Sequence, residues 1–274
     1  MTVSGAYLGC DMLLEITTPA TVVFSIAPST TAGVLDVEEL TVTCDDLPFE
    51  ATVRHVVGDY GTRLHKLDLP PGRIGVRYEA HFTPADATTN QADDEVELLT
   101  YLRPSRFCPS DRLAGLASAE LSYLPKGQER LDGLTMWVAR RLAYVVGSSG
   151  PLDSAVETLL AGQGVCRDYA HLMVAMARAL DMPARFASVY APGLFPMDFH
   201  AVAEIYVDGQ WNAVDATYLA PRPSLVRIAT GRDAADTAFL TTIDGEVELL
   251  DVVVKASVDG ELPRDSYTDN FSLA

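Results

Sequence analysis

The stretch GQGVCRDYAHLMVAMARALDMPAR, residues 162–185, decides the fold. Apart from His171 and Arg178, nearly every residue after its first turn is apolar. Such a pattern predicts a helix of about fourteen residues that other parts of the protein enclose on most sides. Cys166 stands immediately before this helix, at its N-terminus, and the helix ends before Pro183, because proline cannot continue the hydrogen-bond ladder of a helix. A cysteine is therefore expected at the first turn of a buried helix.

This position has chemical consequences for Cys166. The positive end of the helix dipole favours a thiolate, and the free N–H groups of the first turn can stabilise an oxyanion. Gly162 and Gly164 allow the backbone to approach a substrate closely. Asp168 lies where an acid caps a helix, so we expect a structural role for it. Taken alone, the start of the helix is equally compatible with an inert, buried cysteine.

A second stretch, DFHAVAEIYVDGQWNAVDAT (198–217), predicts two strands joined by a tight turn at Asp208-Gly209. With that turn, Glu204 pairs with Ala213 and the next pair on the same face is Val202 with Asp215. His200 then lies diagonal to Asp215 on one face, within reach of a hydrogen bond. A carboxylate in this position fixes the tautomer of the ring and stabilises its protonated form. The register thus favours a His200–Asp215 pair over a solitary core histidine.

The sequence gives little support for a catalytic role of the other histidines or for a metal site. His55, His65 and His81 lie on expected strands and are interpreted as structural. His171 points away from Cys166 by the 3.6-residue period, and we expect it to form hydrogen bonds behind the site. Cys166, His200, Asp215 and His171 could in principle ligate zinc, but none shows the short paired spacing of known zinc motifs. No GxSxG motif supports a serine nucleophile.

The chain changes character near residue 105. Before it, β-branched segments broken by turns predict strands at 21–27, 34–44, 51–58, 62–69 and 72–82. After it, capping residues and apolar periodicity predict helices from 110 or 111 to about 121, from about 131 to 146, and from 154 to about 161. We predict an α+β protein: a β-sandwich-like domain over 1–103, then a catalytic domain over 104–274 with a C-terminal strand extension. That extension contains an expected strand at 246–255, and we assign it to the catalytic domain on sequence order.

Composition narrows the function classes. The 274 residues include 38 acidic and 20 basic side chains, a net charge of −18. This surplus repels phosphate backbones and anionic lipid, so nucleic-acid and membrane partners are not expected. The N-terminus lacks a signal-peptide pattern, and the four cysteines are widely spaced, so we expect a cytoplasmic protein with free thiols and no cofactor. The sequence leaves the oligomeric state open.

Three motifs together resemble one known family. GVCRDYAHL, LDMPAR and the stretch 198–217 closely resemble the bacterial transglutaminase-like family, whose members are often described as cysteine proteases. YLRPSRFCPSD (101–111) resembles the linker that follows the N-terminal β-domain in such proteins. The resemblance implies a papain-like α+β core with Cys166 as nucleophile, His200 as general base and Asp215 as orienting residue. The chain departs from the family at Val202, where tryptophan is common, and at Asp181, where glycine is usual.

We therefore expect a cysteine peptidase or amidase that acts on peptide or protein amides through a thioester. Two alternatives remain open at this point. An amine could resolve the thioester, which would make the protein a transglutaminase. A chain with the same fold could also be a catalytically silent binding or scaffold module.

Overall fold

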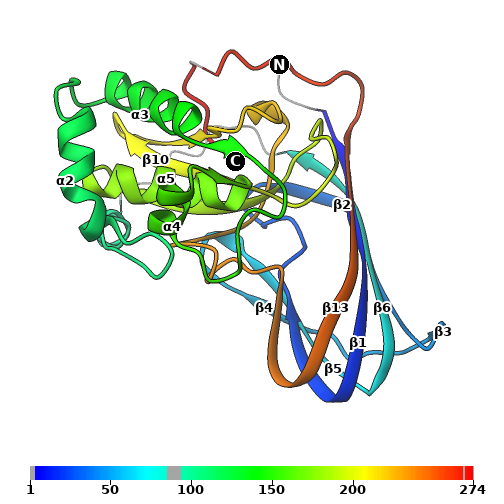
Figure 1. The fold of residues 1–274 in the computed structure, drawn as a ribbon. Helices are drawn as coiled ribbons and strands as arrows, with labels where there is room; N and C mark the ends of the chain where they lie inside the picture. Colours follow the sequence, from blue (N-terminus) through cyan, green and yellow to red (C-terminus); the bar gives the residue numbers. More distant parts are fainter. Residues whose placement is uncertain (1–3, 85–93, 268, 274) are drawn as a thin grey trace.

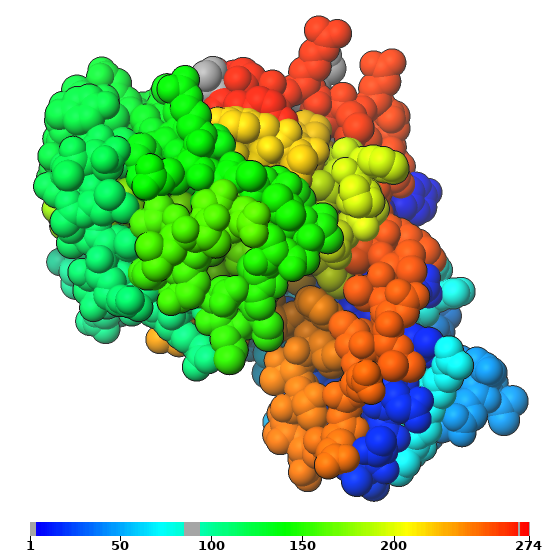
Figure 2. Space-filling model, viewed as in Figure 1, coloured from blue at the N-terminus to red at the C-terminus, as the bar shows by residue number. Residues whose placement is uncertain are grey.

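The structure, a computed structural model, describes residues 4–84, 94–267 and 269–273. A helical half contains a short sheet, and a long twisted sheet extends away from it (Figure 1). Helices and antiparallel sheets thus occur together, as the predicted α+β class requires. In the space-filling view the two halves lie against each other, and C-terminal residues cover the top of the helical half (Figure 2).

The long sheet has seven strands in the described residues, in the order β3-β2-β6-β1-β5-β4, with β13 also paired to β1. All the pairings are antiparallel. Alternate residues of β1 such as Leu14 and Ile16 are buried, as expected for a strand with one face on a core. The strands are β1 (Ala6–Phe24), β2 (Gly33–Cys44), β3 (Leu47–Pro48), β4 (Arg54–Val57), β5 (Arg63–Leu69), β6 (Gly72–Pro84) and β13 (Leu240–Val258).

Each of the five strands predicted in this region overlaps an observed strand, but residues 6–20, which make up most of β1, were not predicted to be a strand. The strands form one hydrogen-bonded sheet that curves around its core, because β1 pairs with β6 along its first half and with β5 along its last residues. The division of the chain at residue 103 stays a prediction.

The expected C-terminal strand exists, but its position differs from the assignment to the catalytic domain. β13 is longer than predicted and pairs with β1 from Ala6↔Val258 to Phe24↔Leu240. It therefore belongs to the long sheet, and in Figure 1 it runs beside β1. The physical reason is the free side of β1, whose N–H and C=O groups need partners. A strand pattern does not reveal which sheet edge the strand will join.

The helical half contains α1 (Glu95–Thr100), α2 (Ser110–Leu121), α3 (Gln128–Arg141), α4 (Ala155–Ala161) and α5 (Cys166–Ala179). The predictions for α2, α4 and α5 are confirmed, including the Ser154–Glu157 capping box at the start of α4. α3 begins and ends earlier than predicted, because residues 143–144 form a parallel bridge with residues 163–164. These two short strands are β7 (Ala143–Tyr144) and β8 (Gln163–Gly164). The short helix α1 was not predicted.

A four-stranded sheet in the order β11-β10-β9-β12 packs against α5. Its strands are β9 (Ala184–Tyr190), β10 (His200–Val207), β11 (Gln210–Val214) and β12 (Val226–Gly231). The predicted hairpin register is confirmed, with Val207↔Gln210 at the turn and Glu204↔Ala213 further along. Because β10 is central, both of its neighbours hold it in place.

The two halves share a core. Tyr190, Val226 and Ile228 of the four-stranded sheet belong to the same apolar cluster as the buried side chains of β1 and β6. The Tyr190 hydroxyl donates a 2.8 Å hydrogen bond to the Ile26 carbonyl. The elements that carry the candidate site are therefore packed directly on the long sheet.

Candidate active site

Cys166 is the first residue of α5, as predicted, and its side chain is partly exposed. Its Sγ lies 4.0 Å from the Phe199 carbonyl oxygen, which precedes β10. Gly164 makes this geometry possible, because a Cβ there would lie 2.6 Å from the Asp168 Cβ. The helix tip and the start of β10 therefore meet at the sulfur.

Asp168 has the structural role that the sequence predicted. Its carboxylate is fully buried and accepts hydrogen bonds from the Val165 N–H at 2.8 Å and from the Ser149 hydroxyl at 2.5 Å. The Arg167 guanidinium donates to the same carboxylate and to the Gly150 carbonyl. Asp168 thereby fixes both the start of α5 and the loop beside it.

His200 and Asp215 form the predicted pair. His200 Nε2 lies 2.8 Å from Asp215 Oδ2, and both side chains are buried. The other carboxylate oxygen accepts from the N–H and the hydroxyl of Thr217, at 2.9 and 2.6 Å. Thr217 therefore fixes one oxygen of the Asp215 carboxylate, and the other oxygen binds the His200 imidazole.

The electrostatics favour a charged pair. Burial alone would lower the pKa of His200, but Asp215 and a hydrogen bond with Cys166 raise it to about 10. Burial likewise opposes the charge on Asp215, yet His200 and Thr217 keep the pKa of this carboxyl group below its usual value. Nε2 is engaged by Asp215, and Nδ1 has no conventional hydrogen-bond partner among the described residues. Nδ1 is therefore the nitrogen left to interact with the Cys166 thiol.

The other histidines lie apart from this pair. His171 is fully buried between the rings of Phe107 and Phe186, and its Nε2 accepts from the Ala234 N–H at 3.1 Å. Burial lowers its pKa to about 4, so the ring is neutral at physiological pH. It forms hydrogen bonds behind the site, as predicted.

The three histidines of the long sheet divide between its inside and its surface. Burial lowers the pKa of His65 to about 4, and His55 lies edge-on to it at 4.9 Å. His81 binds Asp36 and Asp259 at the surface. Among residues 4–84, 94–267 and 269–273, no group of three or more His, Cys, Asp or Glu side chains is arranged to hold a metal ion.

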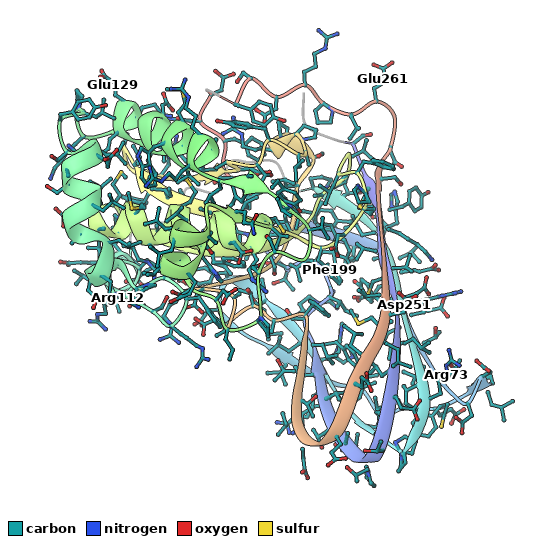
Figure 3. All side chains as sticks on the ribbon, viewed as in Figure 1. Arg73, Arg112, Glu129, Phe199, Asp251 and Glu261 are labelled. Carbon is teal, nitrogen blue, oxygen red and sulfur yellow. The ribbon has the colours of Figure 1, made fainter. Side chains whose placement is uncertain are left out.

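Two residues near Cys166 were not anticipated. Tyr144 lies opposite Gly164 in the β7–β8 bridge, and burial raises the pKa of its hydroxyl to about 12 while a backbone hydrogen bond from Cys166 opposes the rise. Asp198 precedes Phe199 and lies close enough to His200 for the charges to interact. Figure 3 shows Phe199 between the helical half and the long sheet. Tyr144 is brought close to Cys166 because it pairs with Gly164, which lies two residues before Cys166 in the sequence. The sequence gives no sign of this short parallel pairing, so Tyr144 could not be predicted as a site residue.

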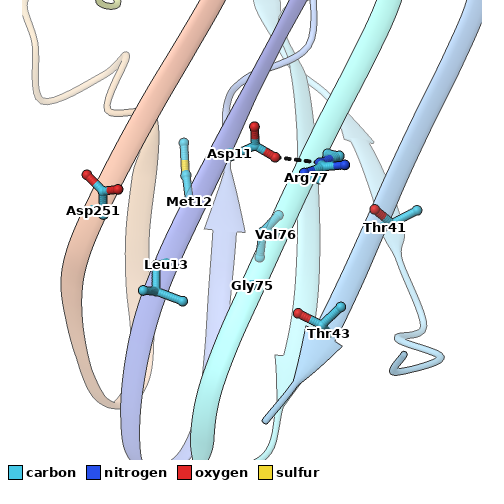
Figure 4. A pocket seen from close by; sticks show the side chains of 9 residues that line it. All are labelled: Asp11, Met12, Leu13, Thr41, Thr43, Gly75, Val76, Arg77 and Asp251. Atoms are coloured by element: carbon cyan, nitrogen blue, oxygen red, sulfur yellow. Dashed lines mark hydrogen bonds and ion pairs between the residues drawn. The ribbon is translucent and has the colours of Figure 1, made fainter. Parts of the chain in front are cut away.

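A separate hollow of about 380 Å³ lies on the outer face of the long sheet (Figure 4). It forms where Gly75 faces Thr43 and Leu13 on the neighbouring strands, and the Asp11–Arg77 ion pair spans it. Neither Cys166, His200 nor Asp215 lines it. These three residues lie instead at the start of α5, at the start of β10 and just after the end of β11.

Comparison with known proteins agrees with this geometry. Residues 118–216 match the family model described as the transglutaminase-like superfamily. The whole chain superposes on 96% of a crystal structure from Cytophaga hutchinsonii named "Putative Cysteine Protease", with 30% identity and a TM-score of 0.88. The chain belongs to the transglutaminase-like superfamily. The family comprises cysteine-dependent hydrolases and transferases, and membership confirms the predicted fold class.

More distant relatives of this superfamily member are also found. The uncharacterized protein ML0607 of Mycobacterium leprae is 25% identical over 168 residues, which are 56% of this chain and 59% of that protein. The match therefore spans less than two thirds of that curated relative. The periplasmic domain of TgpA from Pseudomonas aeruginosa is 18% identical over 78% of this chain and 90% of its own, with a TM-score of 0.42. Among the described residues, no helix is long and apolar enough to cross a membrane.

Proposed function

We propose that this protein hydrolyses amide or peptide bonds through a thioester, with Cys166 as nucleophile, His200 as acid and base, and Asp215 as orienting residue. The observation that carries the proposal is the buried 2.8 Å hydrogen bond between His200 and Asp215 beside a cysteine at a helix tip. Cys166 and the His200–Asp215 pair come from two separate segments of the chain, so they come together only in the folded protein. A raised pKa keeps His200 protonated at neutral pH, which stabilises a thiolate on Cys166.

The reaction balances with these groups alone. The thiolate attacks the carbonyl carbon, a C–S bond forms, and the carbonyl oxygen takes the negative charge. His200 then gives its proton to the leaving nitrogen, and the C–N bond breaks to leave a thioester. Water next gives a proton to His200 and attacks the thioester carbon. Breaking the C–S bond releases the acid and restores the thiolate–imidazolium pair.

The oxyanion needs hydrogen-bond donors. The Cys166 N–H belongs to the first turn of α5, so it makes no bond within the helix and donates to the Tyr144 hydroxyl oxygen instead. A substrate oxygen that replaces this acceptor would receive hydrogen bonds from both the Cys166 N–H and the Tyr144 hydroxyl. Donors that are already positioned beside each other stabilise developing charge with little reorganisation.

A panel of peptide and amide substrates tests the proposal. We expect Cys166→Ala and His200→Ala to abolish hydrolysis while circular dichroism and the unfolding temperature show an intact fold. Asp215→Ala is expected to lose less activity, because its carboxylate orients the ring. Wild-type rates in either of the first two variants would disprove the assignment.

The same panel separates hydrolysis from acyl transfer. Each substrate is incubated with and without an added primary amine, and the products are identified by mass spectrometry. Free acid as the main product in both conditions is expected for a hydrolase. An amide adduct that dominates whenever amine is present would instead make the protein a transglutaminase.

Thiol reactivity provides a test that needs no substrate. At pH 6, iodoacetamide is expected to modify Cys166 much faster than the other three cysteines. Cys10 and Cys108 are buried, and burial raises the pKa of both thiols, that of Cys10 to about 12. Cys44 is partly exposed and serves as the matched control. Equally slow modification of all four would favour a silent module.

A further inference from the structure

Asp198 is a carboxylate at the mouth of the site that has no basic partner. Its Oδ1 accepts a 2.7 Å hydrogen bond from the N–H of Phe199, and the side chain is exposed. Among the ion pairs of the described residues, none includes Asp198. The buried carboxylates of Asp168 and Asp215 differ from Asp198, because each binds a cationic side chain. One oxygen of Asp198 therefore remains available to a ligand.

The position of this carboxylate is tied to the nucleophile. The carbonyl of the next residue, Phe199, lies 4.0 Å from the Cys166 sulfur. Asp198 also interacts electrostatically with the Tyr144 hydroxyl. The same hydroxyl interacts electrostatically with Cys166 and Asp215. The charge of His200 acts on Asp198 in turn. Asp198 thus lies within electrostatic range of the groups around the Cys166 sulfur, where a substrate must bind.

Two exposed apolar side chains lie on the same segments as the polar groups. Phe195 precedes Asp198 by three residues and is 90% exposed, and Val146 follows Tyr144 by two residues and is 78% exposed. A substrate that lies over Asp198 would displace water from its carboxylate, and the attraction between this charge and a cation increases as water is excluded.

We propose that Asp198 selects substrates that carry a basic side chain, lysine or arginine, within one or two residues of the bond that Cys166 attacks. This inference rests on the proposed function and adds the substrate class. The ammonium or guanidinium group binds the free oxygen of Asp198, and the acidic surplus of the chain attracts basic peptides toward the site.

Matched peptides test the inference. Three series differ only in one residue beside the attacked bond, which is lysine, its uncharged isostere norleucine, or glutamate. For the wild type we expect kcat/KM to be at least tenfold higher with lysine than with norleucine. Asp198→Asn is expected to remove this preference, and Asp198→Lys to shift it toward glutamate. Glu129→Gln is the control, an exposed acid on α3 that lies on the far side of the helical half (Figure 3).

The results distinguish the two proposals. Turnover of the norleucine peptide by the wild type supports the proposed function, whatever the charge preference. A lysine preference that persists in Asp198→Asn, or its absence from the wild type, overturns the role of Asp198 alone. Absence of all turnover, together with slow modification of Cys166, would overturn the proposed function.

Charged thiol reagents give a second measurement that needs no substrate. Methanethiosulfonate reagents form a disulfide with a thiolate and release methanesulfinate. We compare the rates at Cys166 for the aminoethyl reagent, a cation, and the sulfonatoethyl reagent, an anion. The ratio of the two rates is expected to fall at least fivefold in Asp198→Asn and to stay unchanged in Glu129→Gln. An unchanged ratio in Asp198→Asn would refute the inference.

Discussion

The two sheets of the protein are stabilised in different ways. In the long sheet the core consists largely of apolar side chains such as Leu14 and Ile74, and charges such as those of Glu79 and Lys255 pair at the surface. In the four-stranded sheet Glu204 is fully buried in the middle of β10. Apolar burial is non-directional, whereas a buried charge needs partners at fixed positions. The second sheet therefore uses directional contacts where the candidate site requires geometry.

Glu204 organises this network. It accepts hydrogen bonds from Arg185 at 2.9 Å and from Arg227 at 2.7 Å, which lie on the two strands beyond β10. Burial alone would raise the pKa of Glu204, but the two guanidinium groups hold it below its usual value. Arg185 also binds Glu97 and lies 4.1 Å from the Trp211 ring. The strand that begins with His200 is thereby fixed from several directions.

Removing this central charge is expected to have the largest effect. Glu204→Gln leaves the buried Arg227 guanidinium without a counter-charge and leaves Arg185 with Glu97 alone, which costs about 3–5 kcal/mol of unfolding free energy. Urea unfolding followed by circular dichroism measures it. Glu79→Gln in the long sheet is the control and should change stability by less than about 0.5 kcal/mol, because its contact with Lys255 is exposed. A loss below about 1 kcal/mol in Glu204→Gln would contradict the contrast between the sheets.

A cavity in the long sheet is the next largest change. Leu14→Ala removes a fully buried side chain and is expected to cost about 3 kcal/mol of unfolding free energy. Leu13→Ala, one residue away on the half-exposed outer face, should cost clearly less. Activity per folded molecule should be preserved in both variants. A change in kcat for Leu14→Ala would show that the long sheet also adjusts the site.

Tyr144→Phe affects chemistry without affecting stability. We expect kcat to fall about a hundredfold, since one oxyanion donor contributes on this scale, and KM to stay close to that of the wild type. The rate of iodoacetamide modification should not change, because alkylation forms no oxyanion. Tyr123→Phe, an exposed tyrosine between α2 and α3, is the control. A hundredfold slower alkylation in Tyr144→Phe would instead indicate a disturbed nucleophile.

The last prediction concerns the dependence of stability on pH. The pKa of His200 is raised to about 10, so its contribution to stability is complete below pH 6.5 and is lost as the pH rises toward 10. The pKa of Asp215 is lowered, so its contribution is present above pH 4 and is lost in acid. The stability difference between wild type and Asp215→Asn should therefore be greatest between about pH 4 and 6.5. The Leu14→Ala difference should not follow this curve.

Local patterns were sufficient for much of the site. The alternation in β10 and the Asp208-Gly209 turn predicted the register that brings His200 to Asp215, because the turn fixes every later pair. The long apolar run predicted α5 and placed Cys166 at its tip. These features depend on residues that are close in sequence.

Contacts between remote segments could not be predicted in this way. Nothing in the pattern of residues 240–258 indicates that they pair with β1, since many free strand edges would accept them. Tyr144 reaches the helix tip through a two-residue parallel bridge, which is too short to leave a periodic signal. The partners of Glu204 come from β9 and β12, on the side of β10 away from the hairpin, so its burial could not be predicted from the hairpin alone.

The pairing of β13 with β1 has a consequence for protein synthesis. The N-terminal strands leave the ribosome first, and one side of β1 stays unpaired until residues 240–258 have been synthesised. An open strand edge is a site of aggregation, and the nascent chain carries it throughout that interval. We expect chains arrested before residue 240 to be trapped by chaperones more than chains arrested after residue 258. Equal capture of both, measured on stalled ribosomes, would show that the sheet closes without its last strand.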